Sequence, residues 1–189
     1  MSRIGVVLVV ASLLLGCGSG AGSLDGKVQG HEVAVKEAVF FVLDNGVTLV
    51  AAGDQEDLCA ILNGQQRPSS EMNLLEVGLY NWNGTSLQPL VTGSYTVART
   101  LSTAGLYSYP LLFWTRECIT FGALGPNSGS VNVESVGLPQ SGAHTVISVD
   151  LAFGAAHLSG HLDATYCPLA ETTGTACQPQ LRSGPPATG

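Results

Sequence analysis

Four polar residues near the carboxyl end of the chain have the residue types and the spacing to do chemistry. They lie in two segments, residues 145–153 and 158–166, whose alternating apolar and polar residues are typical of strands with one solvated face. On a strand, the side chains of His161 and Asp163 would lie about 7 Å apart and could reach one metal ion. The sequence therefore offers a candidate metal or acid–base cluster, formed by Ser148, Asp150, His161 and Asp163. An ordinary solvated sheet face is the alternative interpretation.

The turn between these two segments decides whether the four residues share a face. A two-residue turn at Gly154-Ala155 pairs Leu151 with Leu158 and Ser148 with His161, so that apolar residues face apolar residues and polar residues face polar ones. A three-residue turn would mix the two faces. Glycine at the first turn position also favours a type II′ turn. We therefore predict a tight hairpin at Gly154-Ala155.

Other motifs of known catalytic and metal sites are incomplete in this sequence. His31-Glu32 begins like a zinc-protease motif, but Val35 occupies the position of the second histidine. His157 and His161 have a metal-binding spacing for a helix, but on a strand they would lie about 13 Å apart. The acidic run at residues 54–57 fits no EF-hand loop and is expected to begin one or two helical turns that end near residue 63. We expect no cofactor.

Composition favours a β-protein and argues against nucleic acid as a partner. Only 11% of the residues are charged, against about 25% in typical proteins. Acidic residues outnumber basic ones by 14 to 7, and no basic stripe is present. Trp82, Trp114 and the five tyrosines either line a sugar or peptide groove or pack across strands. Short strands with Asn-Gly and glycine-rich turns predict an all-β fold, an antiparallel β-sandwich or barrel-like fold with one short helical turn region.

The amino end has the order of residues found in an export signal. Arg3 gives a positive start, and the apolar run at residues 4–15 is shorter than the roughly 20 residues that a membrane-spanning helix needs. The segment Leu14-Leu15-Gly16-Cys17 resembles the lipobox of bacterial lipoproteins. The resemblance implies cleavage before Cys17, a diacylglycerol on its thiol and a further acyl chain such as palmitate, which together give stable anchoring. The alternative is an ordinary secretion signal followed by a disulfide cysteine.

This resemblance divides the chain into four parts. We expect a lipoprotein signal peptide at residues 1–16, a lipidated flexible tether at 17–23, a single β domain at 24–177 and a disordered tail at 178–189. Gly18 follows the lipidated cysteine, and in Gram-negative lipoproteins a residue other than Asp at this position implies export to the outer membrane.

The number of cysteines agrees with lipidation. The chain has five cysteines, and lipidation of Cys17 leaves an even number, which suits disulfides in an oxidising compartment. The remaining four are Cys59, Cys118, Cys167 and Cys177, which allow three pairings. We favour Cys59 with Cys118 and Cys167 with Cys177, because the second pair closes a small loop that would hold the tail against the last strand.

Several further segments resemble a family of small uncharacterised lipoproteins that is common in myxobacteria. The matching segments are Asp57-Leu58-Cys59-Ala60, Gly93-Ser94-Tyr95, Arg116-Glu117-Cys118, Ser128-Gly129-Ser130-Val131 and the closing segment at residues 158–167. These motifs are structural and carry no chemistry. The resemblance implies a β-domain of the cell envelope and specifies no role for it.

Together these features predict a lipid-anchored β-domain of the cell envelope, held by acyl chains on Cys17, that is structural or binds an envelope protein or glycan. Membership of a secretion or surface assembly is a further hypothesis. No catalytic activity is evident from the motifs. The alternative is an envelope hydrolase or metal-binding protein that uses Asp150, His161 and Asp163.

Overall fold

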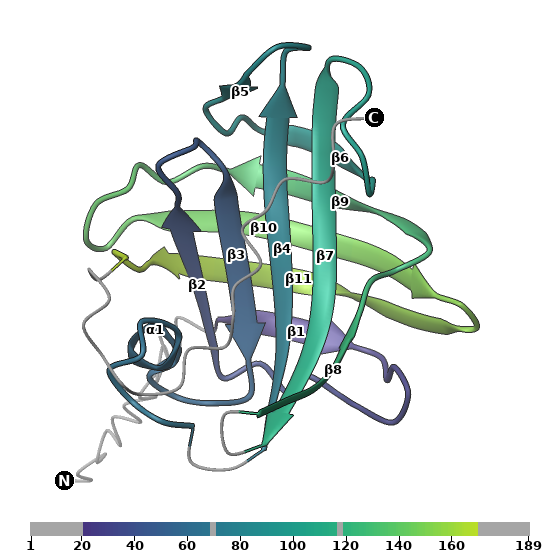
Figure 1. The fold of residues 1–189 in the computed structure, drawn as a ribbon. Helices are drawn as coiled ribbons and strands as arrows, with labels where there is room; N and C mark the ends of the chain where they lie inside the picture. The colour runs from purple at the N-terminus through teal and green to yellow at the C-terminus, as the bar shows by residue number, and fades with distance from the viewer. Residues whose placement is uncertain (1–20, 69–70, 117–118, 170–189) are drawn as a thin grey trace, which may run out of the picture.

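A computed structural model describes residues 21–68, 71–116 and 119–169, which form strands and one short helix (Figure 1). In chain order the elements are β1 (Gly22–Asp25), β2 (Glu37–Val42), β3 (Thr48–Gly53), α1 (Leu58–Leu62), β4 (Met72–Trp82), β5 (Leu87–Gln88), β6 (Gly93–Val97), β7 (Gly105–Arg116), β8 (Ile119–Leu124), β9 (Ser128–Ser135), β10 (His144–Phe153) and β11 (Ala156–Tyr166). None of the helical structure in these ranges has the length and hydrophobicity needed to span a membrane.

Eight strands close into a barrel. The strand order is β4-β3-β2-β11-β10-β9-β6-β7, and β7 pairs back with β4 along its whole length. The short contacts of β2 with β11 and of β6 with β7 are parallel, and the other pairs are antiparallel. β1, β5 and β8 attach to β11, β4 and β7 from outside the ring. The prediction of an all-β, barrel-like fold with one short helical region is confirmed.

The barrel is flattened into two layers (Figure 1). β2, β3, β4 and β7 run side by side as the front layer, and β9, β10 and β11 cross behind them as the back layer. Side chains from both layers meet between them in one core, for example Val50 and Leu75 from the front and Val131, Ile147 and Leu162 from the back. The interior is therefore filled by side chains, as is common in barrels of about eight strands.

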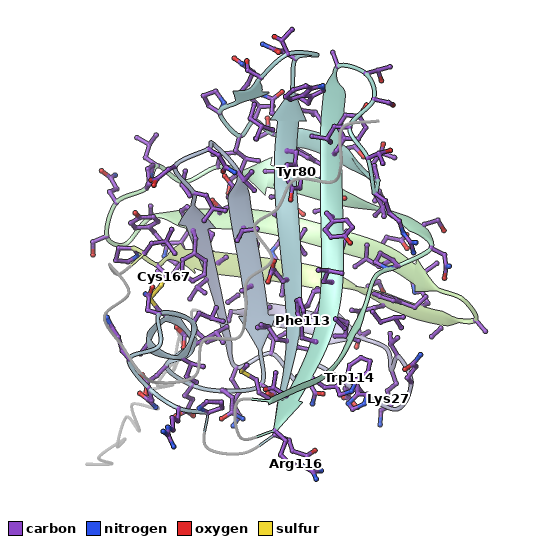
Figure 2. All side chains as sticks on the ribbon, in the orientation of Figure 1. Lys27, Tyr80, Phe113, Trp114, Arg116 and Cys167 are labelled. Carbon is purple, nitrogen blue, oxygen red and sulfur yellow. A yellow bond between two sulfur atoms is a disulfide. The ribbon has the colours of Figure 1, made fainter. Side chains whose placement is uncertain are left out.

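The front layer is buried on both faces. All six residues of β3 are buried, and the residues that point away from the interior form a second core cluster with α1. Tyr80 on β4 and Phe113 on β7 belong to this outer cluster (Figure 2). Burial on both faces explains why residues 38–43 and 47–52 are almost continuously apolar.

The back layer has one buried and one solvated face, and its hairpin has the predicted register. Leu151 lies opposite Leu158, and Ser148 lies opposite His161. Gly154 has a φ of 65°, and Ala155 is not among the described non-glycine residues with positive φ, so the turn matches type II′. The hairpin prediction is therefore confirmed in both turn and register.

The predicted tether at residues 17–23 is too long at its carboxyl end. Gly22 and Ser23 belong to β1 and pair with Leu162 and His161 of β11. A Cβ atom at Gly22 would lie 2.0 Å from the carbonyl oxygen of His161, so glycine is needed here for close backbone approach, not for flexibility. The predicted signal peptide, Cys17, the start of the tether and the tail at 178–189 lie outside the described residues, as does the end of the predicted domain.

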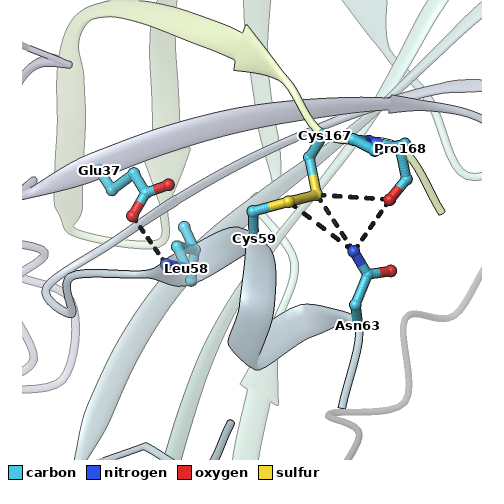
Figure 3. The surroundings of a disulfide bond; sticks show 6 residues. All are labelled: Glu37, Leu58, Cys59, Asn63, Cys167 and Pro168. Atoms are coloured by element: carbon cyan, nitrogen blue, oxygen red, sulfur yellow. Dashed lines mark hydrogen bonds between the residues drawn. A yellow bond between two sulfur atoms is a disulfide. The ribbon is translucent and has the colours of Figure 1, made fainter. Parts of the chain in front are cut away.

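The predicted disulfide pairing is wrong, because Cys59 is bonded to Cys167 (Figure 3). The parallel contact between β2 and β11 brings the end of β11 beside α1, and the two Cα atoms are 5.7 Å apart. The side-chain amide of Asn63 lies 3.4 Å from the sulfur of Cys167 and donates to the carbonyl oxygen of Pro168 at 2.9 Å. Cys118 and Cys177 lie outside the described residues.

Candidate functional site

The four residues of the predicted polar cluster share the solvated face of the back layer, but they divide into separate pairs. Asp150 Oδ1 lies 2.5 Å from His157 Nε2, and Asp163 Oδ1 lies 2.8 Å from His144 Nδ1. His161 Nδ1 lies 3.4 Å from a carboxylate oxygen of Glu134 on β9, and Ser148 lies opposite His161. Among the described residues, no three His, Cys, Asp or Glu side chains could together hold a metal ion. The face thus carries exposed histidine–carboxylate pairs that do not converge on one point.

Trp114 is engaged by protein groups and offers no free stacking surface of the kind a sugar site needs. Its ring stacks on the imidazole of His31 with the centroids 4.3 Å apart. A Cβ at Gly122 would lie 2.1 Å from Cζ2 of the indole, so the backbone of β8 packs directly against it. His31 Nδ1 lies 3.0 Å from Asn73 Oδ1, and the amide of Asn73 donates to Asp54 at 2.9 Å. This chain of contacts fixes the β1–β2 connection against the barrel.

The other large aromatic residues also pack within the fold. Trp82, Tyr80, Tyr107 and Tyr109 belong to or contact the outer cluster of the front layer. Tyr95 is buried in the interior core. The interpretation that these residues pack across strands therefore fits the structure better than an aromatic groove.

A cleft of about 340 Å³ opens at one end of the barrel, where the β2–β3 hairpin turns. The Asn45-Gly46 turn joins the two strands. Val42 and the buried residues Phe40 and Thr48 line the cleft beside it, and Phe40 also belongs to the interior core. This volume lies at the lower end of the range for small-molecule sites, which commonly occur at the mouths of barrels.

Two loops complete the walls of the cleft. One runs from β5 through Pro89 to Leu90, and the other follows β9 from Val136 to Pro139. Both loops contain proline, which lacks the N–H that strand pairing requires. The chain leaves the sheet at these positions, and the residues there line the cleft. β5 and the turn of the β2–β3 hairpin lie near the top of Figure 1.

Exposed apolar side chains gather at this cleft. Within the described ranges, four large hydrophobic residues are strongly exposed: Val91 at 43%, Val136 at 37%, Leu138 at 69% and Leu169 at 45%. Val136 and Leu138 line the cleft, and Val91 follows its wall residue Leu90. An exposed apolar surface around a concave site is typical of a binding surface.

The side chains that line the cleft are suited to binding and not to acid–base chemistry. No ionisable side chain is among its described lining residues, and Thr48 and Gln88 are the polar ones. Sequence analysis missed this site, because its walls come from loops about 50 residues apart in the chain. The available signal was the presence of leucine and valine beside Pro89 and Pro139, in turns where polar residues are usual.

One ionisable side chain, Glu76 of β4, is buried in the outer cluster of the front layer, and it does not line the cleft. It lies between Ala51 of β3 and Leu111 of β7, with 3% of its surface exposed. Burial raises the pKa of its carboxyl group to about 7, and its Oε2 atom has no hydrogen-bond partner. Burial, followed by the charge of Glu76, raises the pKa of Tyr80 to about 12.

No protein-family model matches this chain, and no curated protein or solved structure matches it either.

Proposed function

We propose that this chain is a lipid-anchored protein of the cell envelope whose β-barrel binds an apolar ligand in the cleft at the barrel end. The observation that carries the proposal is the coincidence of a cavity of about 340 Å³, uncharged walls and exposed Val136 and Leu138 at the rim. Burial of apolar surface contributes roughly 25 cal/mol per Å², so even a small ligand that covers these side chains gains appreciable affinity.

The lipid anchor rests on the lipobox and is supported by one feature of the fold. A disulfide between Cys59 and Cys167 suits an oxidising compartment outside the cytoplasm. Cys17 stands five residues before Gly22, so the tether reaches about 17 Å at most and holds β1 near the lipid surface. β1 lies low in Figure 1, and β5 beside the cleft lies at the top. In this proposal the cleft faces away from the membrane. Because Gly18, and not Asp, follows the lipidated cysteine, we propose that this membrane is the outer membrane.

A catalytic or metal-dependent role on the back layer has less support. Asp150 and Asp163 each lie against a different histidine, and His161 lies near Glu134. Such a role would need groups that converge on one reacting atom or ion, and these pairs are spread over an open sheet face.

Membrane fractionation tests the anchor. We expect the protein to be extracted with detergent and to carry acyl mass on a chain that begins at Cys17, and we expect Cys17→Ala to lose both the acyl mass and the membrane association. A soluble, unacylated product from the unaltered chain would overturn the envelope anchor.

Binding of N-phenyl-1-naphthylamine, a neutral dye whose fluorescence rises in apolar surroundings, tests the cleft. The mature chain, residues 17–189, would carry Cys17→Ser so that no acyl chain competes. Leu138→Ser should weaken dye binding about fivefold, because it removes apolar surface from the rim. Leu169→Ser removes another exposed leucine that does not line the cleft and should leave dye binding unchanged. Absence of dye binding, or equal losses in both variants, would overturn the binding site.

A further inference from the structure

The hydrogen-bonding character of the cleft restricts the polar end of its ligand. Pro89 and Pro139 stand in its two loop walls and have no N–H to donate. The side-chain amide of Gln88 donates to Ser86 Oγ at 2.9 Å and to the carbonyl oxygen of Leu87 at 3.1 Å, which leaves the Gln88 carbonyl oxygen to accept a hydrogen bond. Of the two polar side chains in the lining, Gln88 therefore presents an acceptor, and the Thr48 hydroxyl can donate or accept. A ligand group that donates hydrogen bonds fits it better than a carboxylate, which only accepts them.

The charges around the cleft act in the same direction. Along the chain, no Lys, Arg or His lies within two residues of any lining residue, whereas Asp44 and Glu134 do. Glu134 lies beside His161 on the solvated face of the back layer. Asp44 is exposed in the β2–β3 turn, two residues before the lining residue Gly46. The whole chain also has a formal net charge of −7. His144, whose backbone packs against the lining residue Gly137, is paired with Asp163. These charges disfavour an anion in the cleft more than a neutral or cationic group.

The size and the mostly aliphatic lining of the cleft favour one apolar group. Phe40 closes its inner end with 1% of its surface exposed, and the walls are mostly aliphatic, with Val42, Leu87 and Leu90 among them. A cavity of about 340 Å³ accommodates a small molecule or one chain of a larger amphiphile.

We infer that the cleft binds an aliphatic amphiphile whose polar end is neutral or cationic, such as an alkyl alcohol or an alkylamine, and discriminates against fatty-acid-like anions. The aliphatic chain lies against Phe40 and the leucine walls. The polar end stays at the rim, between the carbonyl of Gln88 and the turn that carries Asp44. This inference rests on the proposed binding function of the same cleft.

Displacement of bound N-phenyl-1-naphthylamine by three ligands of equal chain length tests the inference. The ligands are decanol, decylamine as its ammonium ion and decanoate, each below its micelle concentration at neutral pH, with the mature chain carrying Cys17→Ser. We expect decanol and decylammonium to displace the dye at concentrations at least about tenfold lower than decanoate. Leu138→Ser should weaken the binding of all three ligands.

A charge reversal separates the role of Asp44 from that of the apolar walls. Asp44→Lys should reduce the difference in affinity between decylammonium and decanoate by about two- to threefold, because one exposed charge acts through water and salt. The affinity for decanol, which has no charge, should not change. Glu56→Lys makes the same change of charge at an exposed residue that does not line the cleft, and should leave the difference between decylammonium and decanoate as it was.

The possible failures are distinguishable. If the dye does not bind, or if none of the three ligands displaces it, the proposed binding function falls. If all bind but decanoate binds as tightly as decanol, or more tightly, the inference about the polar end is overturned and the binding function stands. If Asp44→Lys and Glu56→Lys reduce the difference in affinity between decylammonium and decanoate equally, Asp44 has no specific role in the discrimination.

Discussion

The two layers of the barrel place their charged groups in opposite environments. The back layer carries three histidine–carboxylate pairs on its open face, where the side chains are 35% to 70% exposed. The front layer has apolar residues on both faces and holds one buried carboxyl group among its described residues, Glu76, at 3% exposure. Water screens the charges of the first set, whereas nothing compensates the charge of the second. One buried carboxyl group in the front layer should therefore influence stability more than all the surface pairs of the back layer together.

The largest expected effect is that of the disulfide that ties the front layer to the end of the back layer. Replacing Cys59 and Cys167 together by Ala should lower the free energy of unfolding by about 4 kcal/mol, because the bond closes a loop of 108 residues. Urea denaturation of the double variant beside the unaltered chain measures it. Cys17→Ser is the matched control and should leave the free energy of unfolding unchanged. A loss below about 1 kcal/mol would show that the bond is not needed to hold α1 against β11.

The next effect is a pH dependence that originates in Glu76. Its carboxyl group has a pKa of about 7 in the folded chain and of about 4.5 when unfolded, so the folded state binds the extra proton between these values. Stability is therefore full below about pH 4.5, falls as the pH rises toward 7 and stays low above it, a loss of about 3 kcal/mol for this group. Glu76→Gln should abolish this loss and raise stability at pH 8.

Denaturation curves at pH 5 and pH 8 measure this prediction. Glu56→Gln, at an exposed position, is the control and should leave the pH dependence as it is. If the free energy of unfolding changes between pH 5 and pH 8 by the same amount in the unaltered chain and in Glu76→Gln, the carboxyl group of Glu76 reaches water or a partner.

The smallest effect is expected on the back layer. Asp150→Asn should change the free energy of unfolding by less than about 1 kcal/mol, because its pair with His157 is exposed. The same denaturation measurement checks it, and 1 M salt should reduce even that difference. A loss as large as that of the buried group would erase the contrast between the layers.

The same contrast explains how far the sequence predicts the fold. The β10–β11 hairpin of the back layer could be predicted in register because each strand has one solvated face, so alternation and the Gly154-Ala155 turn leave one consistent pairing. In the front layer, burial on both faces removes the alternation. The pairing of β2 with β3 could be predicted from the Asn45-Gly46 turn, but the partners of β4 and β7 could not. The helical region was expected from residue 54 to 63, but α1 begins only at Leu58. Asp57 has a φ of 57° there, and Glu37 accepts the hydrogen bond of the Leu58 N–H.

The features that the sequence did not predict depend on contacts between distant segments. The partner of Cys59 is decided by the parallel contact of β2 with β11, and no local pattern indicates that contact. The cleft needs the turn at Gly46, the loop at Pro89 and the loop at Pro139 to meet at one end of the barrel. The sequence correctly places the predicted polar cluster on the solvated face of the back layer, namely Ser148, Asp150, His161 and Asp163. It does not predict the histidine–carboxylate pairs, because these involve Glu134 of β9 and the additional histidines His144 and His157.

The disulfide also changes what a protease can do to this protein. The bond between Cys59 and Cys167 makes residues 59–167 a covalent ring, and both loop walls of the cleft lie within it. A single cut in the ring, for example at the exposed Leu138, leaves the two fragments joined through sulfur and still paired along β10, β11 and their neighbours. Nicking would therefore be invisible on a non-reducing gel, and the fragments would separate only when a reductant also reaches the bond.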